Sequence, residues 1–255
     1  MNKVRVFVLR VAGSNCDHET AFAFEQAGAS ASLVHIGELI RGERSLDKFH
    51  VLAIPGGFTY GDDLGAGKIL ANEIRFRLGR DVHRFVESGR LVLGICNGFQ
   101  ALVKAGILPS PQDARQLMSL TYNDSGKFEC RWVHLKVNGD SPCVFTKGIE
   151  RLHLPVAHGE GKVVVPPEVL SRTRKVLHYV DEFGNRGGYP HNPNGSIDDI
   201  AGVCDDSGRV FGLMPHPERA IRGSHQPGWT LREAEEESGD GLRLFINAVE
   251  WARRL

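Results

Sequence analysis

The chain has 255 residues, ample for one domain with a real core and marginal for two, so we expect a single domain over residues 1–255. Hydrophobic residues make up 41% of the sequence and charged residues 24%, which is typical of folded globular proteins and argues against disorder. The 31 Lys and Arg residues balance the 31 Asp and Glu residues, and no basic stripe is visible, so we expect no nucleic-acid partner.

The start of the chain and the cysteines bear on where the protein works. The apolar stretch that begins at Val4 is far too short for a signal sequence or a membrane span, so we expect a cytoplasmic protein with no membrane contact. No Cys-x-x-Cys pair occurs, which argues against a disulfide framework and a zinc knuckle, and no metal cluster is evident, so we expect no metal. The five irregularly spaced cysteines are Cys16, Cys96, Cys130, Cys143 and Cys204.

Strand-like and helical segments alternate through the first half of the chain. The segments 4–9, 31–36, 51–54 and 91–95 are predicted strands, and 17–26, 70–87 and 98–104 are predicted helices. Asp17 is expected to cap the first helix and Gly28 to end it. This order implies a parallel, doubly wound sheet with helices on both faces, in which ligands bind beyond the carboxyl ends of the strands. The Gly56-Gly57 and Cys96 turns both fall at such ends.

The second half of the chain has a different pattern. The segments 132–137, 176–180, 200–204 and 209–214 are predicted strands, the last two joined as a hairpin by a turn at 205–208. Residues 222–240 have the composition of a surface loop or insertion, and Leu242, Phe245 and Val249 mark one face of a final amphipathic helix. We therefore expect an α/β fold: a doubly wound, mixed and mainly parallel sheet flanked by helices, with a smaller antiparallel portion in the second half.

The turn Gly94-Ile95-Cys96-Asn97-Gly98 lies between a predicted strand and a predicted helix. Its pattern matches a nucleophile elbow with cysteine in place of serine, where bulky side chains two residues away would collide with neighbouring elements. A helix N-terminus favours the attacking thiolate over the thiol, whose reference pKa is about 8.5. The same pattern also fits a buried structural cysteine, but the strand and helix around it favour Cys96 as a nucleophile.

Attack on an amide carbonyl produces an oxyanion that two backbone N–H groups usually stabilise, each lowering the barrier by about 3 kcal/mol. Asn97, the residue after the nucleophile, offers one of these donors. The other is expected at Gly56-Gly57, where glycine permits close approach and unusual backbone angles. Taken alone, this run also fits an ordinary Pro-Gly-Gly turn.

A cysteine hydrolase needs a base that later protonates the leaving group, and histidine suits both steps. Among eleven histidines, His216 follows a strand between two prolines, with Glu218 two residues on. In an extended segment both side chains point the same way, so the carboxylate can orient the imidazole. His158, followed by Glu160, is the main rival, and local chemistry alone leaves both open.

Together, these residues resemble the class I, triad-type glutamine amidotransferases. Gly-x-Cys-x-Gly followed by Gln100, with a later His-Pro-Glu, is the pattern of that family. The resemblance implies the following site: Cys96 as nucleophile, His216 as base, Glu218 as orienter, Gly57 and Asn97 as oxyanion donors, and Gln100 in the pocket near the amide end of the substrate. It favours His216 over His158.

Five longer runs resemble the glutaminase components of phosphoribosylformylglycinamidine synthases, namely 55–63, 96–100, 155–161, 192–196 and 213–219. The resemblance implies hydrolysis of L-glutamine through a Cys96 thioester, with ammonia passed to a large synthetase subunit for purine biosynthesis. A small bridging subunit is a further candidate partner. ATP and magnesium are expected on the synthetase and no cofactor on this chain, in which no phosphate-binding loop motif occurs. The runs 64–68 and 222–240 depart from the family pattern.

Three alternatives remain open. The chain could serve another class I amidotransferase, although the Asn-Pro-Asn-Gly-Ser and His-Gly-Glu-Gly runs argue against it. It could be a DJ-1-like or other cysteine hydrolase, which would not need the late His-Pro-Glu. It could be a scaffold subunit without catalysis. Asn123, Phe128 and Arg131 are candidates for holding the amino and carboxylate ends of the substrate, but the sequence does not choose among them.

Overall fold

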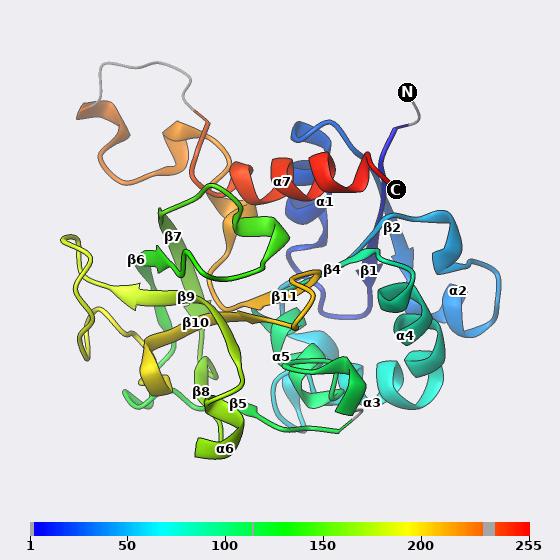
Figure 1. Ribbon diagram of the computed structural model, residues 1–255, viewed down its shortest axis with the longest axis horizontal. Helices are drawn as coiled ribbons and strands as arrows, with labels where there is room; N and C mark the ends of the chain where they lie inside the picture. Colours follow the sequence, from blue (N-terminus) through cyan, green and yellow to red (C-terminus); the bar gives the residue numbers. More distant parts are fainter. Residues whose placement is uncertain (1–2, 114, 232–237) are drawn as a thin grey trace.

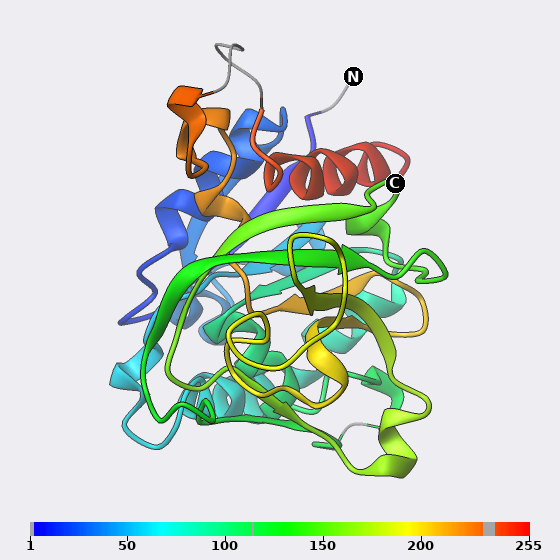
Figure 2. The ribbon, with the colours of Figure 1, turned by 90° about the vertical axis from the view of Figure 1, so that its left-hand side faces the viewer.

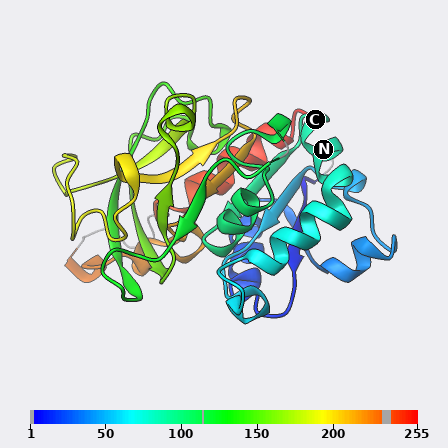
Figure 3. The same ribbon diagram turned by 90° about the horizontal axis from the view of Figure 1, so that it is seen from below.

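The computed structural model describes residues 3–113, 115–231 and 238–255. A nine-stranded sheet runs through the molecule in the order β2-β1-β3-β4-β11-β10-β9-β6-β7, with helices packed against it (Figure 1). Seen from below, the first half of the chain (blue to teal) lies on one side and the green to yellow strands on the other (Figure 3). The sheet has a parallel and an antiparallel half, which meet where β11 pairs with β10.

Parallel strands form the first half of the sheet. They are β1 (Arg5–Arg10), β2 (Ser30–His35), β3 (Val51–Ile54), β4 (Leu91–Ile95) and β11 (Val210–Leu213). Every residue of β3, β4 and β11 is buried, which is the pattern of parallel strands covered on both faces by helices. The bounds predicted for β3 and β4 are confirmed, and those for β1 and β2 are correct to within one residue.

The helices are α1 (Asp17–Gln26), α2 (Ile36–Ile40), α3 (Lys68–Glu73), α4 (Gly79–Glu87), α5 (Asn97–Lys104), α6 (Pro167–Leu170) and α7 (Leu242–Ala252). Helices α1 and α7 lie together on one face of the sheet and α3 and α5 on the other (Figure 1). Across the first pair, the Phe24 and Phe245 rings meet edge to face at 4.9 Å.

Two expectations about helices are wrong in detail. Asp17 does not cap α1: the N-cap residue is Cys16, and Asp17 lies in the first turn, where its carboxylate pairs with Arg10 at 2.9 Å. The helix predicted over 70–87 is α3 and α4 joined by a π-helical turn, Ile74–Leu78, a local widening that hydrophobic periodicity does not reveal. Gly28 ends α1 as expected, with a φ of +89°.

Antiparallel strands continue the same sheet beyond β11 (Figure 2). They are β10 (Ile200–Cys204), β9 (Arg174–Val180), β6 (Glu129–Val137) and β7 (Arg151–His158), while β5 (Ser119–Thr121) and β8 (Lys162–Val164) pair separately. The predicted hairpin is present, and the Asp205 carboxylate accepts the Arg209 and Val210 N–H groups at its turn. The α/β fold with a mixed sheet is thus confirmed.

Strand β7 was not predicted, although its burial alternates along its length. Pro155 lies within it, and a proline usually argues against a strand. The exception has a physical reason: β7 is the last strand of the sheet, where one side of the strand has no ladder to complete. The Pro155 carbonyl accepts the His216 N–H at 2.8 Å, so this edge strand supports the site described below.

Part of the segment expected to be a surface loop, 222–240, falls on residues 232–237, outside the described residues. Its described part contains the short 3-10 turns Gly223–His225 and Trp229–Leu231 and a bridge between Arg222 and Ser238. The predicted final helix is α7, which buries Phe245 and Val249 as expected. Among the described residues, no helix is long and apolar enough to cross a membrane.

Candidate active site

Cys96 lies on the sharp turn between β4 and α5, with a φ of +50° and a ψ of −106°. Such a backbone conformation is strained for a residue with a side chain and is found at functional sites. The neighbouring glycines have a steric reason: a Cβ on Gly98 would lie 1.9 Å from the Ile54 carbonyl oxygen, and one on Gly94 would lie 2.8 Å from the Gly98 carbonyl oxygen. The structure therefore gives the predicted nucleophile elbow its expected geometry.

His216 reaches the same place from the end of β11. Its Nδ1 lies 2.6 Å from Glu218 Oε1, and both side chains are buried. The segment is not extended as expected, because Pro217–Arg219 forms a 3-10 turn. This turn, rather than the alternation of a strand, folds the carboxylate back onto the imidazole.

The ring and Cys96 share the space above Gly56. A Cβ on Gly56 would lie 2.7 Å from His216 Cε1 and 3.4 Å from Cys96 Cβ, so only glycine fits between them. Burial lowers the pKa of His216, but the charges of Glu218 and of a Cys96 thiolate outweigh it and hold that pKa well above its ordinary value. Since Glu218 occupies Nδ1, the buried Nε2, which makes no hydrogen bond within the described residues, is free to exchange a proton with the thiol or substrate.

His158 has a different environment. Its Nδ1 lies 3.1 Å from Asn123 Oδ1, an atom that also accepts the Gly161 N–H at 3.0 Å, so Nδ1 must donate. Burial, and then the charge of His216, lower the pKa of His158 to about 4. Glu160 accepts the Ala66 N–H at 3.3 Å instead of meeting this imidazole. The structure therefore joins only one of the two His-x-Glu pairs, and it is 216–218.

The two expected oxyanion donors come from neighbouring strand ends. Gly57 has a φ of +145°, and a Cβ there would lie 2.3 Å from the Gly13 carbonyl oxygen. Its N–H donates no hydrogen bond within the described residues, whereas the next one, on Phe58, donates to the Gly13 carbonyl at 2.8 Å. Asn97 is the first residue of α5, where an N–H has no partner inside the helix. Both groups are thus unoccupied donors beside the nucleophile turn.

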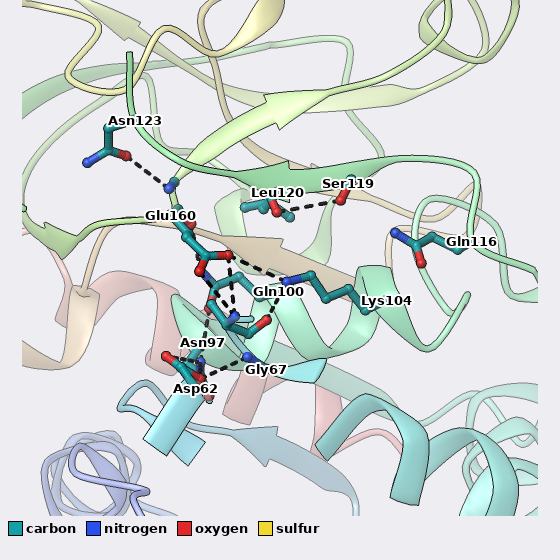
Figure 4. Close-up of polar contacts among 12 residues, drawn as sticks. Asp62, Gly67, Asn97, Gln100, Lys104, Gln116, Ser119, Leu120, Asn123 and Glu160 are labelled. Atoms are coloured by element: carbon teal, nitrogen blue, oxygen red, sulfur yellow. Dashed lines mark hydrogen bonds and ion pairs between the residues drawn. The ribbon is translucent and has the colours of Figure 1, made fainter. Parts of the chain in front are cut away.

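Gln100 lies one turn along α5 and is buried. Its Nε2 donates to the Glu160 carbonyl at 2.5 Å, and its Oε1 accepts from Asn97 Nδ2 at 3.0 Å (Figure 4). The side-chain amide expected near the substrate is therefore hydrogen bonded within the chain on both sides.

The three candidates for the ends of the substrate lie in different settings. Asn123 is buried and holds His158, whereas Phe128 is half exposed and its ring lies 6.2 Å from that of Phe58, beside the Gly57 turn. The Arg131 guanidinium is paired with Glu129 and lies over the Tyr189 ring. Of the three, Phe128 is the one that the structure places against the predicted oxyanion turn.

Comparison with known proteins gives this constellation its context. A family model described as a CobB/CobQ-like glutamine amidotransferase domain matches residues 3–252. The chain belongs to this glutamine amidotransferase family. The resemblance seen in the sequence is thereby confirmed.

Individual relatives of this glutamine amidotransferase cover 97% or more of its length. It is 56% identical to phosphoribosylformylglycinamidine synthase subunit PurQ of Dehalococcoides mccartyi, with all of both chains covered. It is 44% identical to the subunit of the same name from Methanococcus maripaludis, with 97% of each covered. Among solved structures, a chain of PurLQS from Thermotoga maritima is 35% identical and superposes with a TM-score of 0.76, covering 98% of this chain and 99% of that one.

One residue of this amidotransferase site was not anticipated. Cys16 was grouped with the structural thiols, but its sulfur lies 4.0 Å from His216 Nδ1 and 3.0 Å from Arg219 Nη2. Burial raises the pKa of Cys16, and the charge of Glu218 adds to this, while His216 and Arg219 act in the opposite direction. No spacing rule joins residues 200 positions apart in the sequence. Cys16 follows β1 and His216 follows β11, and both side chains lie over Gly56, whose turn follows β3 between those strands.

Cys16, His216 and Glu218 each place one possible ligand atom within 4.8 Å of the others, which is the spacing of a metal site. Their chemistry fits a hydrogen-bonded cluster better. The His216–Glu218 contact is a direct one at 2.6 Å, and the positive Arg219 guanidinium already lies on the Cys16 sulfur. A cation placed there would be repelled by that guanidinium.

Proposed function

We propose that this chain is the glutaminase subunit of a phosphoribosylformylglycinamidine synthase, hydrolysing L-glutamine and supplying ammonia for purine biosynthesis. The relatives that match it over its full length carry that name. The observation that carries the chemical part is the buried His216–Glu218 pair, 2.6 Å apart, next to a cysteine on a strained strand-to-helix turn. We propose further that residues 1–255 work as one domain, since a single sheet contributes both the cysteine and the histidine.

The reaction begins with proton transfer from the Cys96 thiol to His216 Nε2. The raised pKa of His216 favours the resulting thiolate and imidazolium pair. The thiolate adds to the side-chain carbonyl carbon of glutamine, and the Gly57 and Asn97 N–H groups hold the oxyanion that forms. We assign Gln100, buried one turn along α5, to the part of the pocket near the amide end of the substrate.

Breakdown of this intermediate releases ammonia. The imidazolium gives its proton to the departing nitrogen, the C–N bond breaks, and a glutamyl thioester remains on Cys96. The neutral imidazole then removes a proton from water, whose oxygen attacks the thioester carbon. The C–S bond breaks, the thiolate is restored and glutamate leaves, while Glu218 keeps the imidazole oriented throughout.

Ammonia released into water would be protonated and would lose its nucleophilicity, so the product has to pass directly to a second active site. We propose a large synthetase subunit as that partner, with a small bridging subunit as a further component. The similar Thermotoga maritima chain comes from a structure of PurLQS. We assign ATP and magnesium to the synthetase, no cofactor to this chain, and the cytoplasm as its compartment.

The alternatives fit the site less well. A DJ-1-like or other cysteine hydrolase does not require a histidine and glutamate after β11, yet here both are buried beside the nucleophile turn. A scaffold without catalysis does not require the strained φ of Cys96. An amidotransferase that serves another synthetase would have the same site. The relatives that match this chain over nearly all of its length, however, are subunits of phosphoribosylformylglycinamidine synthases.

Glutamate release from glutamine tests the proposal directly. The wild type, Cys96→Ala and Cys130→Ala are assayed alone and with the cognate synthetase subunit. We expect release that requires Cys96, rises with the synthetase, and is unchanged in Cys130→Ala, because Cys130 is an exposed thiol. Absence of release from folded wild type in both settings contradicts the proposal, and so does release that persists in Cys96→Ala.

A further inference from the structure

The two oxyanion donors belong to two different segments of the chain. Gly57 follows β3 and leads into the 3-10 turn Thr59–Asp62, whereas Asn97 begins α5 after β4. An oxyanion is stabilised only when both N–H groups point at one position, so the two segments must hold a fixed separation. Given the proposed function, catalysis depends on the contacts that fix this separation.

The side chain of Asn97 spans the two segments. Its Oδ1 accepts the Thr59 hydroxyl at 2.6 Å and the Thr59 N–H at 3.3 Å. Its Nδ2 donates to Asp62 Oδ1 at 3.0 Å and to Gln100 Oε1 at 3.0 Å. A side-chain amide has two lone pairs and two N–H groups, and here all four are used. We call Thr59, Asp62, Asn97 and Gln100 the amide clasp.

Further hydrogen bonds anchor the amide clasp to its surroundings (Figure 4). The Asp62 carboxylate also accepts the Gly67 N–H at 3.0 Å. Lys104 Nζ donates to the Ala66 carbonyl at 2.6 Å and lies 3.7 Å from the Glu160 carboxylate, which accepts the Ala66 N–H. The loop after Asp62 is therefore tied to α5 and to the turn after β7, so the clasp has rigid support on each side.

The turn held by the clasp is strained. Tyr60 and Asp62 have φ values of +56° and +55°, in the left-handed region that residues with side chains rarely adopt. Each such residue costs about 1–3 kcal/mol and keeps its conformation only when its surroundings enforce it. Asn97 contacts Thr59 and Asp62, on either side of Tyr60, and is 1% exposed. Its contacts are thus placed where they can enforce the strained turn.

We propose that the Asn97 side chain is a positioning group that fixes the Gly57 turn against the nucleophile turn and so aligns the two oxyanion donors. Asn97 then has two separate roles: its backbone N–H binds the oxyanion, and its side chain places the other donor. The negative charge exists only after the thiolate has attacked, so misalignment weakens the transition state and not the bound glutamine.

The variant Asn97→Asp tests the side chain at constant shape. It replaces the Nδ2 donor with an oxygen that faces Asp62 Oδ1 and Gln100 Oε1, so two hydrogen bonds become repulsions. We expect kcat for glutamate release by the complex with synthetase to fall about 10- to 100-fold. This fall should be no larger than the one caused by removing an oxyanion donor altogether. KM for glutamine should stay within about threefold, as removal of a transition-state interaction requires.

Alkylation of Cys96 by iodoacetamide separates positioning from collapse of the site, because this reaction needs the thiolate but forms no oxyanion. The new carboxylate also disfavours the neighbouring thiolate, so the rate is compared at the alkaline plateau, where the thiol is fully ionised in both proteins. There we expect the rate in Asn97→Asp to stay within about twofold of the wild type. Asn247→Asp is the matched control: its Nδ2 donates to the Phe145 and Lys147 carbonyls at 2.8 and 2.9 Å under α7. It should lower thermal stability and leave kcat unchanged.

Thr59→Val gives an independent test should Asn97→Asp fail to fold. It removes only the hydroxyl donor to Asn97 and should lower kcat about threefold to tenfold, again at constant KM. Unchanged kcat in either folded variant overturns the inference, and so does a fall in alkylation as large as the fall in kcat. Wild type that releases no glutamate, or releases it without Cys96, overturns the proposed function instead.

Discussion

Two segments of this molecule have the same pattern, a histidine followed two residues later by a glutamate, and they differ in almost everything else. At 158–160 the imidazole is held by Asn123 and the carboxylate reaches away to the Ala66 N–H. At 216–218 the carboxylate lies 2.6 Å from the imidazole. The pKa of the first histidine is lowered to about 4, and that of the second is raised well above its ordinary value.

The backbone explains this difference. His158 ends β7, and Gly159 follows it, so the chain turns away and carries Glu160 toward α5. After His216, Pro217 begins a 3-10 turn, which brings the carboxylate two residues on back over the ring. The same spacing in sequence therefore gives two different His–Glu arrangements. Where the local turn brings the carboxylate to the imidazole, the carboxylate raises the pKa of the histidine; where it does not, burial lowers that pKa.

The largest expected effect comes from removing the imidazole of the 216–218 pair. His216→Ala removes the group that accepts the thiol proton and protonates ammonia, so we expect glutamate release to fall about 10³-fold, within the range for general acid–base catalysis. His158→Ala should retain at least about tenfold more activity than His216→Ala. Steady-state release by the complex with synthetase measures both, and equal losses would assign the base to neither histidine.

A smaller effect is expected from Glu218→Gln, which keeps the shape of the side chain and removes its charge. The charge of Glu218 helps to raise the pKa of His216, so its loss should lower that pKa and move the alkaline limb of the rate profile toward lower pH. We expect a shift of about one unit or more, with kcat reduced about 10- to 100-fold.

Glu160→Gln is the matched variant in the other segment, and the alkaline limb should keep its position there. The measurement is kcat against pH for both variants and the wild type. A limb that moves in Glu160→Gln, or stays in place in Glu218→Gln, would mean that Glu218 does not tune the imidazole.

The sequence could predict the parts of this site that depend on local pattern. The bounds of β3 and β4 follow from short apolar runs that end in glycine-rich turns, and Cys96 follows from its flanking glycines. The sequence could not predict contacts that depend on the order of strands in the sheet. The approach of Cys16 to His216 is one of these, because it joins the ends of strands far apart in the chain. The edge strand β7 was hidden because Pro155 argues against a strand wherever the edge of the sheet is unknown.

The smallest expected effect is the contribution of His158 to the pH dependence of stability. In the unfolded chain His158 binds a proton near its ordinary pKa of about 6.5, whereas in the folded chain it does so only near about 4. Stability from this group is thus present above pH 6.5 and is lost as the pH falls from there through 4. Between pH 7.5 and 5, His158 should account for a loss of about 2 kcal/mol in the free energy of unfolding.

His158→Gln removes this titration and keeps an amide N–H that can donate to Asn123. The variant should be less stable than the wild type at pH 7.5, but it should lose about 2 kcal/mol less between pH 7.5 and 5 in urea unfolding. The raised pKa of His216 acts in the opposite sense in both proteins and cancels in the difference. Parallel losses in the two proteins would mean that His158 takes up its proton as readily folded as unfolded, and the contrast between the two histidines would then be one of contacts and not of charge.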